Sequence, residues 1–237
     1  MEQGLQKYYD QWDTPWLKLY YRMVWAQLGD LRGRKILDFG SGFGWNANHF
    51  AKYNDVFAIE PNTDMIKHRQ VSNIYNQING NLKSLKLFED KSFDIILCHN
   101  VFEYCPEERL DILQEFDRLL KNEGLISIVK HNHAGAIMQK VVFENNLEQA
   151  LDMLINNNKI NEAFGKINYY NLPELIKDLS IEITKTLGLR TFWALQPNEY
   201  KVEKRWADKM FVLEWNVSDK EDFKSISFFN HILLEKL

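Results

Sequence analysis

Short apolar segments alternate with amphipathic segments along much of the chain. Continuous or near-continuous apolar runs predict buried strands at 35–39, 56–60, 77–80, 93–99 and 125–130. Helical spacing of apolar positions predicts helices between these strands, at 45–52, 63–76 and 107–120. Alternation of this kind is typical of a parallel sheet with helices on both faces. The pattern therefore predicts an α/β fold.

The two flanks of this region have a different pattern. Residues 1–33 form an N-terminal helical segment, in which Pro15 after Thr14 is expected to start a helix. Residues 133–171 are rich in Asn but keep helical periodicity, so we interpret them as a helical insertion that covers the active site like a lid. The remaining elements are a helix at 172–179 and the last strands and helix at 181–192, 207–217 and 226–237. All of this predicts one domain spanning 1–237.

Composition and charge narrow the class of protein. A chain of 237 residues with a formal net charge of −4 does not have the broad basic face of a protein that coats nucleic acid, although a local basic pocket remains compatible. Two cysteines make a disulfide framework implausible. No run of about 18 apolar residues is present, so we expect no membrane span. The polar N-terminus favours a cytoplasmic location.

A glycine-rich turn follows the first predicted strand. Asp38 precedes Gly40, Gly42 and Gly44, and such glycines let the main chain turn tightly and approach a ligand. Dinucleotide-binding proteins need a small residue three positions after the second glycine, whereas Trp45 stands here. The remaining interpretations are a site for a different nucleotide-like cofactor and a purely structural turn.

Two residues at the ends of later strands extend this candidate site. Glu60 ends the second strand about 20 residues after the turn, where a carboxylate accepts hydrogen bonds from both ribose hydroxyls. A solvated acid at a strand end is the alternative. His99 lies at the exit of the fourth strand and is a candidate for cofactor contact or substrate orientation, or else a histidine with a structural role.

The turn, with Asp38 before it, resembles motif I of class I S-adenosylmethionine-dependent methyltransferases, and the resemblance extends over nearly the whole chain. Segments 98–104, 130–135, 188–192 and 227–232 are similar to the bacterial tRNA methyltransferase that esterifies 5-carboxymethoxyuridine at the anticodon wobble position. The resemblance implies a Rossmann-like, mostly parallel seven-stranded sheet with an antiparallel last strand, and S-adenosylmethionine as cofactor. It also implies tRNA as the methyl acceptor.

The resemblance also implies a set of cofactor-binding residues. They are Arg22, Asp38, Gly40, Ser41, Gly42, Gly44, Glu60, Asn81, Leu82 and His99. The chain departs from the tRNA methyltransferase family in having Ser41 where glycine is usual and Glu60 in place of Asp. Residues 143–171 match that family poorly and lack a basic run.

The chemistry of the acceptor determines which further residues are needed. A carboxylate with a pKa of about 4 is already ionised at neutral pH, so it needs a cation to orient it rather than a general base. Arg190 is the candidate for that cation, and a surface salt bridge is the alternative. For a hydroxyl or amine acceptor, His99, His131 or His133 is the candidate base. We expect no metal, because two histidines provide too few ligands.

Three functions remain in competition. The first is methylation of the modified wobble uridine of tRNA, with His99, His133 and Arg190 as catalytic residues. The second is methylation of a small carboxylate, hydroxyl or amine compound. The third is a cofactor-sensing or scaffold protein that has kept the fold. The sequence leaves the oligomeric state open.

Overall fold

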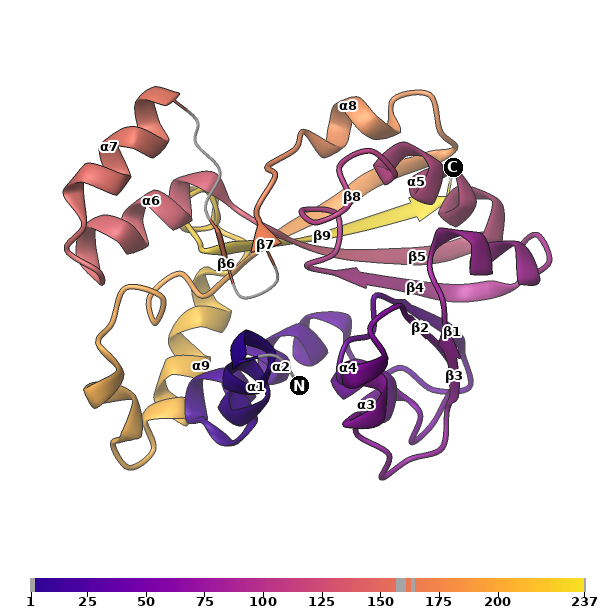
Figure 1. The fold of residues 1–237 in the computed structure, drawn as a ribbon, viewed down its shortest axis with the longest axis horizontal. Coiled ribbons are helices and arrows are strands. Elements are labelled where there is room, and N and C mark those ends of the chain that lie inside the picture. The colour runs from indigo at the N-terminus through magenta and orange to yellow at the C-terminus, as the bar shows by residue number, and fades with distance from the viewer. Residues whose placement is uncertain (1–2, 157–160, 163–164, 237) are drawn as a thin grey trace. The chain divides into compact units, whose positions relative to one another are not determined.

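A computed structural model describes residues 3–156, 161–162 and 165–236 of the chain. Its main sheet contains β1 (Lys35–Phe39), β2 (Asp55–Glu60), β3 (Asn76–Asn79), β4 (Phe93–His99), β5 (Leu120–His131), β8 (Ile181–Leu189) and β9 (Phe229–Lys236). The strand order is β3-β2-β1-β4-β5-β9-β8 (Figure 1). The first five strands pair in parallel, and the last strand is antiparallel. The predicted α/β fold with a seven-stranded sheet is confirmed.

The chain folds into two compact units. The strand unit consists of residues 30–129, 170–185 and 232–237, and the helical unit consists of 1–29, 130–169 and 186–231. The division falls within the residue ranges of β5, β8 and β9.

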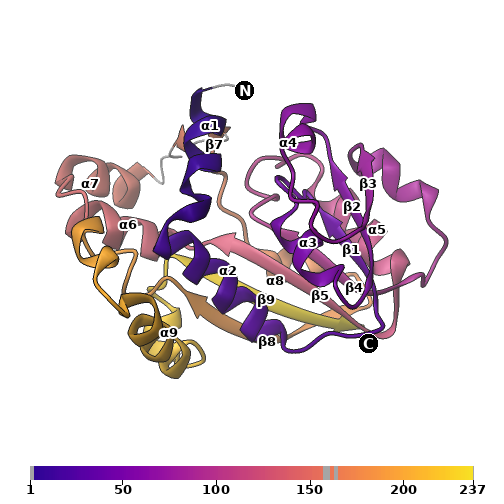
Figure 2. The same ribbon diagram turned by 90° about the horizontal axis from the view of Figure 1, so that it is seen from below.

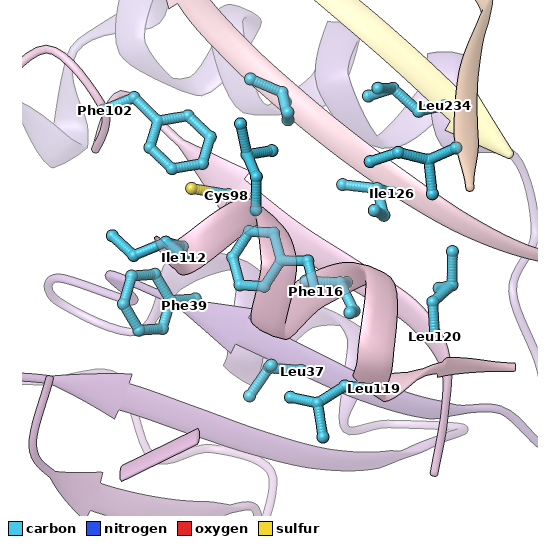
Figure 3. Packing of buried hydrophobic residues seen from close by; sticks show 14 of the residues in the cluster. Leu37, Phe39, Cys98, Phe102, Ile112, Phe116, Leu119, Leu120, Ile126 and Leu234 are labelled. Carbon is cyan, nitrogen blue, oxygen red and sulfur yellow. The ribbon is translucent and has the colours of Figure 1, made fainter. Parts of the chain in front are cut away.

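The strand unit has a core of large apolar side chains around β1, β4 and β5. Its helices are α3 (Trp45–Phe50), α4 (Thr63–Lys67), α5 (Arg109–Leu119) and α8 (Leu172–Ile176), with the 3₁₀ helix η2 (Leu82–Leu87). Figure 3 shows Phe116 of α5 among Leu37, Phe39 and Cys98 from the strands. The Phe39 and Phe116 rings meet edge to face, with centroids 5.5 Å apart. This packing holds the ends of β1 and β4 in position.

The helical unit contains most of the helices that lie outside residues 35–130. They are α1 (Gln3–Asp10), α2 (Pro15–Leu28), α6 (His133–Val142), α7 (Leu147–Asn156), α9 (Trp206–Val217) and α10 (Glu221–Lys224), with the 3₁₀ helices η1 (Gln11–Asp13) and η3 (Asn198–Val202). The short strands β6 (Asn161–Glu162) and β7 (Gly165–Lys166) pair in antiparallel orientation. In Figure 2, α6 lies beside α7 and α2 lies beside α9. The predicted start of α2 at Pro15 is confirmed, with Thr14 Oγ1 accepting from the amide of Leu17.

Several predicted boundaries were wrong. The helix expected at 63–76 ends at Lys67, because the residues beyond it have no apolar face to bury and Ile74 is 97% exposed. Asn73 instead bonds to Asn48. The strand expected at 125–130 already begins at Leu120, because Leu120 pairs with Phe93 of β4. The register then shifts before Leu125, and Glu123 in between has a left-handed φ of 60°.

The helices expected at 107–120 and 172–179 are shorter than predicted, covering Arg109–Leu119 and Leu172–Ile176. The predicted helical insertion at 133–171 is helical in α6 and α7. Its residues 157–160 and 163–164 lie outside the described part. Within that described part, no helix is long and apolar enough to cross a membrane.

Candidate functional site

The glycine-rich turn after β1 has a backbone that only glycine adopts without strain. Gly40, Gly42 and Gly44 have φ values of 75°, 55° and 70°. A side chain at Gly40 would also collide with Val101, whose Cγ2 lies 2.4 Å from the position of a Cβ. The amides of Gly40 and Ser41 both donate to the carbonyl of Ile59, at 2.8 and 3.0 Å, so the turn is tied to the end of β2. The sequence Gly-x-Gly-x-Gly therefore builds an open, tightly curved main chain beside β2.

Glu60 connects the glycine turn to the segment between β2 and α4. Its two carboxylate oxygens accept from the amides of Gly42 and Asn62, each at 2.8 Å. Burial raises the pKa of Glu60, while the two amides act in the opposite direction. Each carboxylate oxygen accepts more than one hydrogen bond, so Glu60 keeps capacity for the hydroxyls of a ribose. Its predicted position at the end of β2 is confirmed, and its contact with the cofactor stays a prediction.

Two buried oxygen atoms beside the turn lack partners in the described structure. They are Oδ2 of Asp38 and Oγ of Ser41. Asp38 is 2% exposed, and burial raises its pKa to about 7 although the amide of Ala47 lowers it. Buried polar atoms are normally hydrogen-bonded. Two such atoms without partners beside the turn therefore fit a polar ligand that supplies the missing hydrogen bonds. The residues present thus suit the amino acid portion of S-adenosylmethionine.

His99 lies at the end of β4 with both ring nitrogens engaged. Asn46 Nδ2 lies 3.1 Å from Nδ1, and Ser127 Oγ lies 2.8 Å from Nε2. An amide nitrogen donates, so Nδ1 accepts and Nε2 carries the proton that is donated to Ser127. A histidine held in this way orients neighbouring groups more readily than it accepts a proton. Its catalytic role stays a prediction.

The remaining predicted cofactor residues have separate structural positions. Asn81 caps η2, with Oδ1 accepting from the amide of Lys83 at 3.1 Å, and Leu82 begins that helix and packs against the core of the strand unit. Arg22 belongs to the helical unit, where it donates to Asp208 at 2.9 Å and lies 4.1 Å from the centroid of Phe211. The role of these three residues in cofactor binding stays a prediction.

Arg190 follows β8 in the helical unit with a left-handed φ of 59°. Its guanidinium lies over the ring of Phe228, 4.5 Å from the centroid, and 5.4 Å from that of Phe229. Aromatic rings hold a guanidinium by its face and leave the donors at its edge directed outward. Arg190 and the rings of Phe228 and Phe229 therefore form a cluster in which a cation is held in a fixed orientation. A residue that orients an anion needs such a fixed position.

Sequence reasoning missed the residue that shapes this turn, which is Glu214 of α9. Its fully buried carboxylate accepts from three successive amides, those of Thr191, Phe192 and Trp193, at 3.0, 2.7 and 3.4 Å. Burial raises the pKa of Glu214 and the amides oppose that rise. An acid in the middle of a helical pattern resembles an ordinary surface residue, so the sequence carried no signal for this role.

The two candidate histidines after β5 contact different rings. His131 ends β5 and lies 4.7 Å from Phe229, whereas His133 begins α6 and lies 4.6 Å from Tyr169 (ring centroids). Burial lowers the pKa of His133, so its imidazole is neutral at physiological pH. The described residues include no group of three or more His, Cys, Asp or Glu side chains that could hold a metal ion.

The sheet order is that of a class I methyltransferase fold, and the glycine turn after β1 and the acid at the end of β2 are the features that indicate S-adenosylmethionine as the cofactor. Residues 37–128 match the family described as "Methyltransferase domain". The fold is that of solved methyltransferases. A putative S-adenosylmethionine-dependent enzyme from Listeria monocytogenes aligns with a TM-score of 0.63 and 13% identity, covering 93% of this chain and 97% of its own.

Two sequence relatives cover different shares of the chain. An uncharacterized protein of Methanocaldococcus jannaschii is 25% identical over 186 residues, which are 78% of this chain and 70% of that protein. A sarcosine/dimethylglycine N-methyltransferase of Aphanothece halophytica is 29% identical over 101 residues, 39% of this chain and 36% of that enzyme.

Proposed function

We propose that this enzyme transfers the methyl group of S-adenosylmethionine to a carboxylate, and that the acceptor is 5-carboxymethoxyuridine in tRNA, which becomes a methyl ester. The observation that carries the proposal is the position of Arg190, whose guanidinium lies over Phe228 and Phe229 on a turn held by Glu214. The cation suits a carboxylate, and the aromatic rings around it suit the planar base to which the carboxylate is attached.

The reaction places few demands on proton transfer. When bound, S-adenosylmethionine supplies a methyl group on a sulfonium, which a carboxylate displaces in line with the departing sulfur. The acceptor carboxylate is ionised at neutral pH, so no residue has to remove a proton. We assign Glu60 to the ribose hydroxyls and Asp38 to the cofactor's ammonium group, and His99 to orientation of the site. Arg190 holds the acceptor carboxylate.

A second candidate function is methylation of a small amine that carries a carboxylate. The similarity to a sarcosine/dimethylglycine N-methyltransferase and the net charge of −4 favour it. In this reaction Arg190 again binds the carboxylate. His133, kept neutral by its lowered pKa, accepts the proton from the amine.

Methyl incorporation into tRNA tests the first function. Labelled S-adenosylmethionine is incubated with the enzyme and tRNA from cells that lack this gene, and the modified nucleosides are analysed by mass spectrometry. We expect a mass gain of one methyl on 5-carboxymethoxyuridine. Arg190→Lys keeps the charge but loses the planar fork, so kcat/KM should fall about tenfold to a hundredfold, the loss expected for a hydrogen bond to a charged group.

Arg205→Lys is the matched control. Arg205 is exposed and has a φ of 63°, close to the 59° of Arg190, so both variants place lysine at a left-handed position. Its kcat/KM should equal that of the wild type. Absence of methyl transfer to this tRNA by an enzyme with demonstrated cofactor binding would refute the tRNA proposal. Methylation of dimethylglycine or sarcosine in a parallel assay would then support the second function.

A further inference from the structure

Lys201 is a buried lysine in η3 of the helical unit. It is 4% exposed, and its Nζ donates to Oδ1 of Asn198 at 2.8 Å. Two rings flank the ammonium, with the centroids of Trp16 and Phe143 at 5.7 and 5.2 Å. Within the described ranges of the chain, no Asp or Glu forms an ion pair with it. Fully buried lysines are rare unless they are paired.

A second buried lysine in the same unit shows the usual solution. Lys140 of α6 is 8% exposed, and its Nζ lies 2.6 Å from a carboxylate oxygen of Glu144. The ammonium of Lys140 is thereby neutralised by a carboxylate just beyond the end of its own helix. Lys201 has only a neutral amide oxygen in the corresponding role, so its charge is uncompensated by any described carboxylate.

The charge of Arg190 adds to this imbalance. Burial, which is the larger cause, and repulsion by Arg190 together lower the pKa of Lys201 to about 8. A buried ammonium with no described carboxylate partner, repelled by a second cation, destabilises the unit. Groups kept in a costly arrangement of this kind are concentrated at functional sites, where a ligand relieves the cost.

We propose that Lys201 is the second cation of an anion site in the helical unit and that, together with Arg190, it binds the carboxylate of the methyl acceptor. This inference rests on the proposed function and identifies the class of ligand more closely as a carboxylate attached to a planar group. Arg190 provides a planar fork of donors, and Lys201 provides a compact charge for the second oxygen. The rings of Trp16, Phe143 and Phe228 supply apolar surface for the attached group.

Binding of a small probe by the full-length protein tests the inference without turnover. Phenoxyacetate carries an aryl-O-CH2-carboxylate group, and phenoxyacetamide has the same shape without the charge. Affinities are measured by NMR titration in the absence of S-adenosylmethionine. We expect the wild type to prefer the acid, and Lys201→Met to weaken acid binding about tenfold to a hundredfold while leaving amide binding unchanged.

Methionine keeps an unbranched stem against Trp16 and Phe143, so the melting temperature of Lys201→Met should equal or exceed that of the wild type. Lys209→Met is the control, because Lys209 is exposed on α9 and the change in net charge is identical. Lys201→Arg should retain most of the preference for the acid.

Equal affinity of the wild type and Lys201→Met for phenoxyacetate overturns the inference, as does a wild type that does not discriminate acid from amide. Equal loss in Lys209→Met also overturns it, because the effect would then be long-range. None of these results touches the proposed function, which fails only if wild-type enzyme does not methylate the tRNA.

Discussion

At the scale of single residues, burial moves two pKa values toward neutrality at the two candidate sites. The pKa of Asp38 rises to about 7, and that of Lys201 falls to about 8. Each group is therefore close to its charge transition at physiological pH, and a ligand of opposite charge stabilises its ionised form. Both shifts come from the tertiary environment, since neither residue has an unusual sequence neighbourhood.

The raised pKa of Asp38 predicts a pH dependence of cofactor binding. Without cofactor, the folded protein holds a proton on Asp38 up to about pH 7, whereas an unfolded Asp loses it near pH 4. The contribution of Asp38 to stability therefore declines between these values. The ammonium group of S-adenosylmethionine requires the ionised form, so affinity should rise with pH up to about 7, with proton release at lower pH.

Isothermal titration calorimetry in two buffers of different ionisation enthalpy measures that proton release. Asp38→Asn should bind more weakly and should show no release, since the amide does not titrate in this range. Wild-type binding that is independent of pH between 5.5 and 7.5 would contradict the assignment of Asp38.

At the scale of elements, the turn after β8 depends on a helix far along the chain. Glu214 of α9 binds the amides of Thr191, Phe192 and Trp193, and thereby fixes the left-handed residue Arg190 that precedes them. A carboxylate serves here because it has two acceptor oxygens and no donor. The position of Arg190 is thus a property of the β8 turn and α9 together.

Glu214→Gln should disturb this turn selectively. A glutamine amide keeps one acceptor oxygen and places an NH2 group against a backbone N–H, so at least one amide loses its partner, at about 1–3 kcal/mol. We expect faster hydrogen exchange at residues 191–193 and a higher KM for the acceptor, with unchanged affinity for S-adenosylmethionine. Asp219, which is exposed directly after α9, provides a control that changes none of these quantities when substituted by Asn. Unaltered exchange at 191–193 would show that Glu214 does not hold the turn.

At the scale of the whole molecule, the residues proposed for the cofactor and for the acceptor belong mainly to different compact units. The glycine turn, Glu60 and His99 are in the strand unit, and Arg190 and Lys201 are in the helical unit. Arg22 is the exception among the predicted cofactor residues. This division predicts that the cofactor and the acceptor each slow the hydrogen exchange of a different set of backbone amides.

Hydrogen exchange with mass spectrometry tests the division on the intact chain. S-Adenosylmethionine should slow exchange at 38–44 and 60–65, and phenoxyacetate should slow it at 189–193 and 198–202. Phenoxyacetamide is the control for charge-independent effects. Protection of 189–193 by S-adenosylmethionine, with no change at 38–44, would reverse the assignment of the two sites.

Prediction from sequence succeeded where the signal is local. The strands 35–39 and 93–99 have the predicted bounds, because a short run of buried apolar residues needs little context. The glycine turn was also identifiable, because glycine at every second position indicates a tightly curved main chain. Prediction failed after Lys67, where the apolar residues Val71 and Ile74 lie on no buried face and remain exposed.

The sequence by itself determined the fold class and indicated the cofactor, through the alternating strand and helix patterns, the turn at Gly40, Gly42 and Gly44, and Glu60 at the end of the next strand. These features depend on neighbours within a few residues, so they can be recognised in the sequence alone. Only the tertiary structure decided that Glu214 binds the turn after β8 and that Lys201 is buried without a described carboxylate partner. Burial and long-range hydrogen bonds depend on residues distant in sequence, and these are what shift pKa values and orient charges for chemistry.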